Sequence, residues 1–241
     1  MFLLVHVDSD REYLREPGAE LQTDLGVLEV PADAEPGDEL TTHLGERFRV
    51  RPLGGPDLFE HFERTGAPMM PRDVGLVIGH AGPAAGDRAL DAGTGTGVLA
   101  AYLGRLGVNV TTYERDPGFA ETARENLRLA GVADRVTVRT GDVRDDLDDL
   151  ADFDLLTLDT GDAPAVVERA PDLLVPGGFL AVYSPFVEAT RAAVEAARAT
   201  DLAAVETHET IGRRMEFEER GSRPATAGVG HTGYLTVARR P

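Results

Sequence analysis

The glycine-rich run from Asp91 to Gly97 restricts the fold of this chain more than any other stretch. The short apolar segment 88–90 precedes it directly, and residues 98–103 after it have the composition of a helix. Glycine lets the backbone approach a ligand closely, and the first turn of a helix leaves N–H groups without a helical partner. A strand, a glycine turn and a helix N-terminus in this order predict a pocket of nucleotide size.

The rest of the chain from residue 86 onward predicts a parallel sheet with helices on both faces, because short apolar runs alternate with helical ones. We expect strands at 88–92, 108–113, 136–139, 153–159 and 179–183, and two closing strands at 203–210 and 234–238 with a loop between them. The helices are expected at 98–105, 119–130, 145–150, 165–174 and 187–199.

The N-terminal part has a different pattern. Short alternating runs at 2–7, 26–30 and 47–51 are separated by glycine and proline turn signals, which predicts a small β module. A linker is expected from 57 to 71, followed by a helix at 72–79 with an acid in its first turn. A chain of 241 residues has room for one α/β domain and a small module. We therefore expect a β domain at 1–58, a linker and first helix at 59–85, and the α/β domain at 86–241.

Composition excludes several classes of function. The chain has no cysteine, which rules out disulfides, thiol nucleophiles and thiolate metal sites, and no side chains have the spacing of metal ligands, so we expect no metal. It also has no lysine, and its 24 arginines stand against 42 acidic residues for a net charge of -18. High charge of one sign is associated with halophilic proteins, so we expect a salt-loving source. Because we find neither a signal peptide nor a membrane-length apolar run, we expect a soluble cytoplasmic protein.

Acidic residues at the predicted strand ends indicate the ligand. Asp91 lies two residues before the first glycine of the turn, where a carboxylate would oppose the pyrophosphate of a dinucleotide. A cationic amino-acid end group fits better there, and S-adenosylmethionine carries both an ammonium and a sulfonium. Glu114, Asp142 and Asp159 end or follow the next three strands, so all four acids are expected at the edge where open α/β sheets bind ligands.

Each of these features also has a simpler interpretation. A glycine turn occurs in proteins that bind NAD or flavins, acids at strand ends are often merely solvated, and Asp159 could cap a following helix. The four acids together with the Pro176-Gly177-Gly178 turn favour S-adenosylmethionine.

Residues 66–240 resemble the class I S-adenosylmethionine-dependent methyltransferases. Within that class they are similar to the tRNA adenine-N1 methyltransferases that modify the T loop, especially the archaeal members. The class resemblance rests on Asp91 to Gly97, Tyr113-Glu114, Gly141-Asp142 and Pro176-Gly177-Gly178. The narrower one rests on Met70-Pro71-Arg72-Asp73, Tyr183-Ser184-Pro185, Arg223-Pro224, His231 to Leu235 and Ala238-Arg239-Arg240. It implies an α/β fold with a Rossmann-like seven-stranded sheet and a small N-terminal β domain, S-adenosylmethionine as cofactor, tRNA as partner and a homotetramer.

The resemblance also implies roles for individual residues. Asp159 is placed beside the reactive centre and is the expected catalytic residue. The expected cofactor-binding residues are Asp91, Gly93 and Gly95 in the turn, Thr96, Gly97, Val98 and Leu99 at the methionine end, Glu114 at the ribose, Asp142 and Val143 at the adenine, and Asp159 itself. The chain departs from the family pattern at Met70, Thr160-Gly161 and Ala189, which affects how the target base is held.

Arginines near the C-terminus are candidates for contacts with RNA. Arg213, Arg214 and Arg223 lie between the last two predicted strands, and His231 follows them. Phosphate contacts usually supply half or more of the hydrogen bonds in protein complexes with nucleic acid. The alternatives are that these arginines balance nearby glutamates in a solvated loop, and that His231 is a hydrogen-bonded structural residue.

Two other functions are compatible with parts of the pattern. A methyltransferase for another acceptor, such as protein isoaspartate or a small metabolite, would share the cofactor motifs but is not expected to have the C-terminal Arg-Pro and His-Thr-Gly-Tyr motifs. A non-catalytic RNA-binding subunit of the same fold would usually lose the glycine turn and its acids, all of which are present here.

Overall fold

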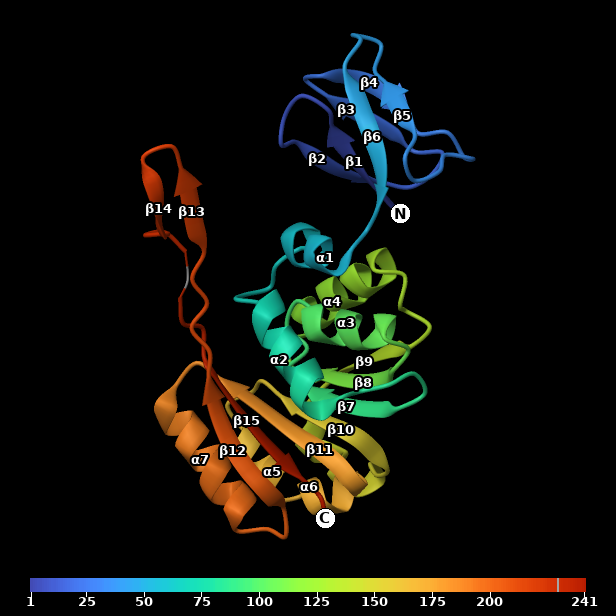
Figure 1. Ribbon diagram of the computed structural model, residues 1–241. Coiled ribbons are helices and arrows are strands. Elements are labelled where there is room, and N and C mark those ends of the chain that lie inside the picture. Colours follow the sequence, from blue (N-terminus) through green and yellow to red (C-terminus); the bar gives the residue numbers. More distant parts are fainter. Residues whose placement is uncertain (229) are drawn as a thin grey trace. The chain divides into compact units, whose positions relative to one another are not determined.

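The computed structural model describes residues 1–228 and 230–241. The chain forms two compact units, one made of residues 1–62 with 128–131 and the other of residues 63–127 with 132–241. Figure 1 shows their elements. Among the described residues, no helix has the length and apolar character needed to cross a membrane.

The first unit is a small β structure, as the turn signals predicted. Four of its strands form an antiparallel sheet in the order β2-β1-β6-β5, and β3 pairs with β4 as a hairpin. The six strands are β1 (Phe2–His6), β2 (Glu12–Arg15), β3 (Glu20–Thr23), β4 (Gly26–Glu29), β5 (Glu39–Thr41) and β6 (Arg47–Pro52). Alternate residues of β6 face inward, so Phe48 and Val50 join Leu4, Leu21 and Leu28 in its core.

A helix that the sequence analysis did not predict follows β6. Helix α1 (Gly55–His61) overlaps the stretch that was expected to be a linker. Its proline lies in the first turn, where the missing N–H costs nothing, and the carboxylate of Asp57 accepts from the N–H of Gly54 at 2.6 Å. Gly54-Gly55-Pro56 is one of the turn signals in the sequence, and the same residues also begin a helix.

The second unit contains the predicted seven-stranded sheet. Its strand order is β12-β15-β11-β10-β7-β8-β9, with neighbours parallel from β11 to β9 and β15 antiparallel to both of its neighbours. The strands are β7 (Arg88–Ala92), β8 (Asn109–Glu114), β9 (Val136–Thr140), β10 (Phe153–Leu158), β11 (Leu174–Ser184), β12 (Ala203–Glu209) and β15 (Tyr234–Arg239). The expected fold class is therefore confirmed.

Helices cover both faces of this sheet (Figure 1). They are α2 (Pro71–Ala81), α3 (Val98–Arg105), α4 (Pro117–Leu129), α5 (Ala163–Val167), α6 (Ala170–Leu173) and α7 (Val187–Arg198). Because side chains alternate along a strand, Leu90 and Leu156 join the cluster that contains Val166 of α5, while their neighbours Ala89 and Leu155, which are also buried, point to the opposite face. Burial on both faces explains the nearly continuous apolar runs of the parallel strands.

Two predicted helices differ from the structure. Residues 145–150 do not form an α-helix but two short 3₁₀ turns, Val143–Asp145 and Leu147–Asp149. The carboxylate of Asp142 accepts from the N–H of Arg144 at 2.9 Å, and such local bonds of aspartate compete with helix formation. The helix expected at 165–174 is divided into α5 and α6, each with a proline near its start, because Pro171 cannot continue a helix but can begin one.

The segment between the two closing strands contains a β-hairpin rather than only a loop. Strands β13 (Met215–Glu218) and β14 (Gly221–Pro224) pair in antiparallel fashion. At its base the N–H of Gly212 donates to the carbonyl of Gly230 at 3.1 Å, which joins the outgoing and returning chains. Phe217 on β13 is 78 % exposed. Of the candidate RNA-binding arginines, Arg223 lies on β14, and Arg213 and Arg214 lie on the chain that leads into β13.

Candidate functional site

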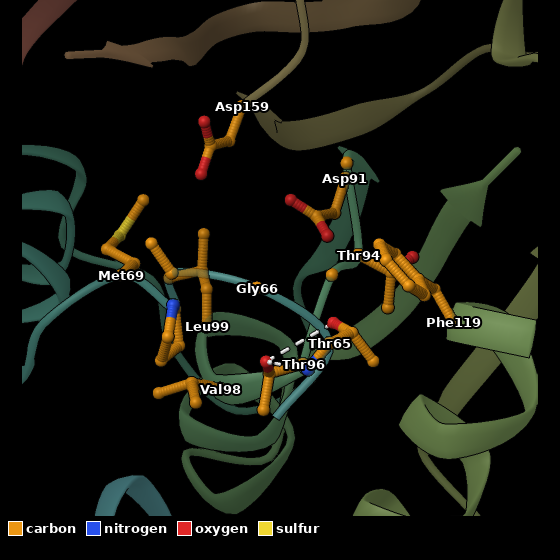
Figure 2. Close-up of a pocket in the computed structure, with 14 residues that line it drawn as sticks. Thr65, Gly66, Met69, Asp91, Thr94, Thr96, Val98, Leu99, Phe119 and Asp159 are labelled. Atoms are coloured by element: carbon orange, nitrogen blue, oxygen red, sulfur yellow. Dashed lines mark hydrogen bonds between the residues drawn. The ribbon is translucent and has the colours of Figure 1, made fainter. Parts of the chain in front are cut away.

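The candidate site lies at the carboxyl ends of β7, β8 and β10. Two adjoining cavities, of about 110 and 350 Å³, share the lining residues Ala67, Gly93, Gly95, Phe119 and Asp159. The smaller cavity is shown in Figure 2, where the carboxylates of Asp91 and Asp159 point toward the same space. This is the edge where open α/β sheets bind ligands, so the strand-end acids are placed as the sequence predicted.

The glycine turn requires glycine for two separate reasons. Gly93 has a φ of 99°, and a Cβ there would lie 2.1 Å from the backbone carbonyl oxygen of Asp159, which no side chain could tolerate. Gly97 has a φ of 84° at the N-cap of α3, a left-handed conformation that favours glycine. The first glycine therefore brings the ends of β7 and β10 together, and the last directs the chain into the helix.

Asp91 is buried, and its carboxylate accepts hydrogen bonds from two threonine hydroxyls. Thr112 of β8 and Thr157 of β10 flank Asp91 in register, and each donates a 2.6 Å hydrogen bond to a different carboxylate oxygen. Thr94 lies 2.5 Å from the Thr112 hydroxyl and extends the network. Burial raises the pKa of Asp91, and the two threonine bonds oppose that rise. A cation in the adjoining cavity would favour the charged form of this carboxylate.

Asp159, which is half-buried, is the second carboxylate of the cavity. Burial raises its pKa to about 7, and the neighbouring charge of Asp91 adds to the increase. Both carboxylates face one cavity, and the pKa of each is raised. A positively charged ligand in that cavity would stabilise their charged forms. A strongly shifted carboxyl in a cleft is also typical of functional sites.

A segment that was expected only as a linker lines one side of the smaller cavity. Residues 65–69 line it, and the N–H of Thr65 donates to the hydroxyl of Thr96 at 3.3 Å (Figure 2). Asn126 of α4, only 4 % exposed, holds the start of this segment. Its amide nitrogen donates to the carbonyls of Glu63 and Thr96 at 2.9 Å, and its amide oxygen accepts from the N–H of Glu63 at 3.0 Å. Asn126 thus ties the covering segment to the glycine turn.

Glu114 lines the larger cavity from the end of β8. One carboxylate oxygen accepts from the N–H of Gly95 and the other from the N–H of Asp116, both at 3.0 Å. Each carboxylate oxygen has a second lone pair, so Glu114 still has acceptor capacity for two hydroxyl groups. The two backbone bonds fix its direction, which is what a site for a ribose diol requires.

Asp142 lies at the other end of the larger cavity, within a group of exposed ion pairs. The guanidinium of Arg144 donates to both of its oxygens, at 3.0 and 2.7 Å, and this hydrogen bonding lowers the pKa of Asp142 to about 2. Asp162 pairs with Arg115 at 2.8 Å and with Arg144 at 3.5 Å. The sequence analysis assigned Asp142 a ligand contact but did not predict its arginine partners.

The structure brings together most of the predicted cofactor-binding residues but separates the predicted substrate-binding ones. Gly97 caps α3 and does not line either cavity, whereas the other ten do line them: Asp91, Gly93, Gly95, Thr96, Val98, Leu99, Glu114, Asp142, Val143 and Asp159. Arg213 and Arg214 line a third cavity. Arg223 pairs with Glu216 at 3.0 Å on the hairpin, and His231 pairs with Glu209 at 2.9 Å.

Besides residues 65–69, the residues of the site that the sequence did not predict include Thr112, Thr157, Phe119 and Asn126. The two threonines did have a signal, since each stands two residues before a strand-end acid, in Thr112-Tyr113-Glu114 and Thr157-Leu158-Asp159. Residues two apart in a strand share a face. Asn126 had no such signal, because only the tertiary fold brings α4 beside residues 63 and 96.

Comparison with known proteins gives consistent results. A family model described as a methyltransferase domain matches residues 89–178. The chain is 34 % identical to the tRNA (adenine(57)-N(1)/adenine(58)-N(1))-methyltransferase TrmI of Methanocaldococcus jannaschii, over 99 % of this chain and 94 % of that protein. It is 32 % identical to a protein-L-isoaspartate O-methyltransferase of Hyperthermus butylicus over 65 % of this chain and 64 % of that protein. A solved S-adenosylmethionine-dependent O-methyltransferase from Thermotoga maritima matches with a TM-score of 0.82 at 26 % identity, covering 99 % of this chain and 92 % of that one.

Proposed function

The chain belongs to the family of the tRNA (adenine-N1)-methyltransferase TrmI, and we propose that it transfers a methyl group from S-adenosylmethionine to N1 of an adenine in the T loop of tRNA. The observation that carries this proposal is the extent of the match. The relationship with TrmI spans 99 % of the chain, including the N-terminal β unit and the hairpin, whereas that with the isoaspartate methyltransferase spans 65 %.

The residues of the cavity fit S-adenosylmethionine. Removal from water disfavours the charged forms of Asp91 and Asp159, and a ligand that carries positive charge would restore them. S-adenosylmethionine has two cationic groups. We assign Asp91 and residues 93–99 to the methionine end, Glu114 to the ribose hydroxyls, and Asp142 with Val143 to the adenine. When bound, the cofactor supplies an electrophilic methyl group on a sulfonium. The covering segment 65–69 excludes water from the methionine end.

Asp159 is the residue we assign to the chemical step. Adenine N1 is already a lone-pair nucleophile, so the protein has to position the base rather than deprotonate it. Positive charge develops on the base as N1 gains the methyl group, and a fixed carboxylate that accepts from the N6 amino group would stabilise that charge. Asp159 lines the cavity and is half-buried, which makes such an interaction stronger than it would be in water.

The target adenine belongs to a folded loop and must leave its base stack to reach a cavity at the strand ends. Enzymes that modify bases commonly turn the nucleotide out of the stack and hold it in a pocket. Met70, at the N-cap of α2, takes the place of the aromatic residue that the family usually has there. A thioether can still pack against the face of a base.

Protein isoaspartate is the strongest alternative acceptor, because an enzyme of that kind is 32 % identical over 65 % of this chain. Labelled S-adenosylmethionine should be incubated at high salt with unmodified tRNA and, separately, with an isoaspartyl peptide. We expect label in the tRNA as N1-methyladenine after nucleoside analysis, and none in the peptide. Label in the peptide alone would contradict the proposed acceptor while leaving the cofactor assignment intact.

Composition supports a halophilic origin and a saline cytoplasm, which we also propose. A net charge of -18 without any lysine implies strong self-repulsion in dilute buffer. At about 1 M salt the Debye length is only about 3 Å, so this repulsion is largely screened. We expect both unfolding temperature and methyl transfer to increase with KCl concentration up to the molar range. Maximal activity at low salt would contradict this origin.

A homotetramer is supported by apolar side chains on the hairpin and its base. Ile211, Met215 and Phe217 are 65 %, 51 % and 78 % exposed, which is unusual for side chains of this size unless they meet a partner. Light scattering should give a mass near four times 25.8 kDa. Substitution of Phe217 by glutamate should lower that mass, whereas a monomer in the unmodified protein would contradict the assembly.

A further inference from the structure

A further cavity of the second unit lies beside the base of the hairpin and not at the cofactor site. It has a volume of about 1000 Å³ and is lined by residues of the α2 N-terminus and of the two chains that lead to and from β13 and β14. The lining residues are Met70, Arg72, Gly212, Arg213, Arg214, Pro224, Ala225, Thr226, Ala227, Gly228 and Gly230.

The charge of this lining is opposite to that of the whole chain. Three arginines face the cavity and none of its described lining residues is acidic, although the chain has 42 acidic residues against 24 basic ones. The guanidinium groups of Arg213 and Arg214 have neither an ion pair nor a hydrogen bond with any described residue. What distinguishes Arg213 and Arg214 is that they line one cavity together with Arg72, so three guanidinium groups face a space that an anionic group could enter.

The third arginine is held in place from several sides. Arg72 donates to the hydroxyl of Thr232 at 3.1 Å, and its Nε lies 3.8 Å from the carboxylate of Asp73. Gly212 passes directly over it, since a Cβ at this glycine would lie 2.9 Å from Nη1 of Arg72. The cation of Arg72 is therefore held in place, and glycine at 212 leaves room for it.

The basic cavity also lies next to the transfer site. Met69 lines the cofactor cavity and Met70, the following residue, lines the basic cavity. The same short stretch continues into Arg72, so residues that line the two spaces follow one another along the chain. A strand held at Arg72, Arg213 and Arg214 would therefore pass beside the segment that encloses the transfer site.

We propose that this basic cavity binds the phosphate groups of the RNA strand that flank the target nucleotide. The inference rests on the proposed function, because it takes the acceptor to be RNA. Planar guanidinium groups match phosphate oxygens in a bidentate manner, and the small residues of the lining let a sugar–phosphate chain approach the backbone closely. Phosphate contacts here fix the register of the strand and leave the choice of base to the adjoining site.

The test compares two double variants that remove the same charge. R213Q/R214Q changes the cavity, whereas R191Q/R198Q removes two exposed arginines of α7 that do not line it. Binding of unmodified tRNA is measured by fluorescence anisotropy over a range of KCl concentrations, and binding of S-adenosylmethionine is measured in parallel. The salt exponent is the slope of the logarithm of the tRNA binding constant against the logarithm of the KCl concentration. For R213Q/R214Q we expect weaker tRNA binding and a salt exponent smaller in magnitude by about two, with unchanged cofactor affinity.

For R191Q/R198Q we expect an unchanged salt exponent, because that pair makes no phosphate contact. Equal exponents in the two double variants would overturn the proposed cavity. A lower mass of R213Q/R214Q in light scattering with unaltered tRNA affinity would also overturn it, and would assign the cavity to contact with a second copy of the chain. Failure of the unmodified protein to methylate tRNA would contradict the proposed function instead, which separates the two results.

Discussion

The two ends of the cofactor site use carboxylates in opposite ways. At the methionine end, Asp91 is buried beside two threonine hydroxyls and Asp159 is half-buried, and removal from water raises the pKa of each, that of Asp159 to about 7. At the adenine end, Asp142 is held by Arg144, which lowers its pKa to about 2. All of these acids lie along one edge of one sheet. Environment rather than position therefore decides which of them responds to pH near neutrality and which responds to salt.

The largest effect is expected at Asp159, because it is assigned to the transition state. D159N keeps the shape of the side chain and removes its charge. We expect the transfer rate at saturating S-adenosylmethionine to fall by about 10² to 10³, the usual effect of losing one such electrostatic partner. Single-turnover kinetics with tRNA measure this rate, and a cofactor titration checks that the site still binds. A near-normal rate with bound cofactor would assign the chemical step elsewhere.

The pH dependence should separate the two ends of the site. Asp159 is neutral below its pKa of about 7, so attraction for a cationic ligand is lost as pH falls through that value. We expect kcat/KM for S-adenosylmethionine to decrease about tenfold per pH unit below 7, because this ratio reports the free enzyme. The profile of D159N should be flat over the same range. A profile shared by the two proteins would mean that another group titrates.

The hydroxyl network beneath Asp91 can be tested with T157V. Valine keeps the β-branched shape but leaves one oxygen of a buried carboxylate without its donor, at a cost of about 1–3 kcal/mol. We expect the free energy of unfolding to fall by that amount, and S-adenosylmethionine to bind more weakly, because the Thr157 bond opposes the rise in the pKa of Asp91 and its loss disfavours the charged carboxylate. T207V is the matched control, since Thr207 pairs with Thr236 far from the cavity in the sheet order. Equal loss of cofactor affinity in both variants would contradict a specific role.

Asn126 should affect the cofactor without touching it. N126A removes three hydrogen bonds that tie residue 63 to the glycine turn, which we expect to raise KM for S-adenosylmethionine about tenfold and to leave KM for tRNA unchanged. Hydrogen exchange at residues 63–69 should become faster. N109A offers the comparison, since Asn109 is exposed and makes one long bond. Parallel increases in both KM values would indicate general destabilisation rather than loss of position.

The smallest effect is expected at the adenine end. Arg144 and Asp142 are 43 % and 20 % exposed, and exposed pairs contribute at most about 1 kcal/mol. R144Q should therefore weaken cofactor binding by less than about fivefold at low salt, and the difference should vanish in molar KCl, where screening is strong. A large effect that persists at high salt would show that Arg144 contacts the ligand directly.

The sequence was sufficient for the sheet and for the acids at its edge, because both depend on local pattern. A strand ends where its apolar run ends, and the following polar residue reaches the ligand edge whatever the rest of the fold does. This is why Asp91, Glu114, Asp142 and Asp159 line the cavities as expected. The helix over 145–150 was predicted wrongly for a local reason too, since side-chain bonds of aspartate compete with the helix.

What the sequence did not reveal depends on residues that are distant along the chain. Asn126 acts on residues 63 and 96, and Arg72 meets Gly212 and Thr232, contacts that exist only after folding. Charge was the least predictable property. Arg213 and Arg223 looked equivalent in the sequence, but in the structure the second has a glutamate partner and the first lines an open basic cavity.

The most direct test of the account is to locate the transferred methyl group. Labelled S-adenosylmethionine is incubated at high salt with a tRNA transcript and with transcripts in which the adenines at T-loop positions 57 and 58, those named for the relative, are replaced by guanine. The account predicts N1-methyladenine in the unmodified transcript, no label when both adenines are replaced, and a greatly reduced rate for D159N. Label that persists after both replacements, or a methylated nucleoside other than N1-methyladenine, would contradict it.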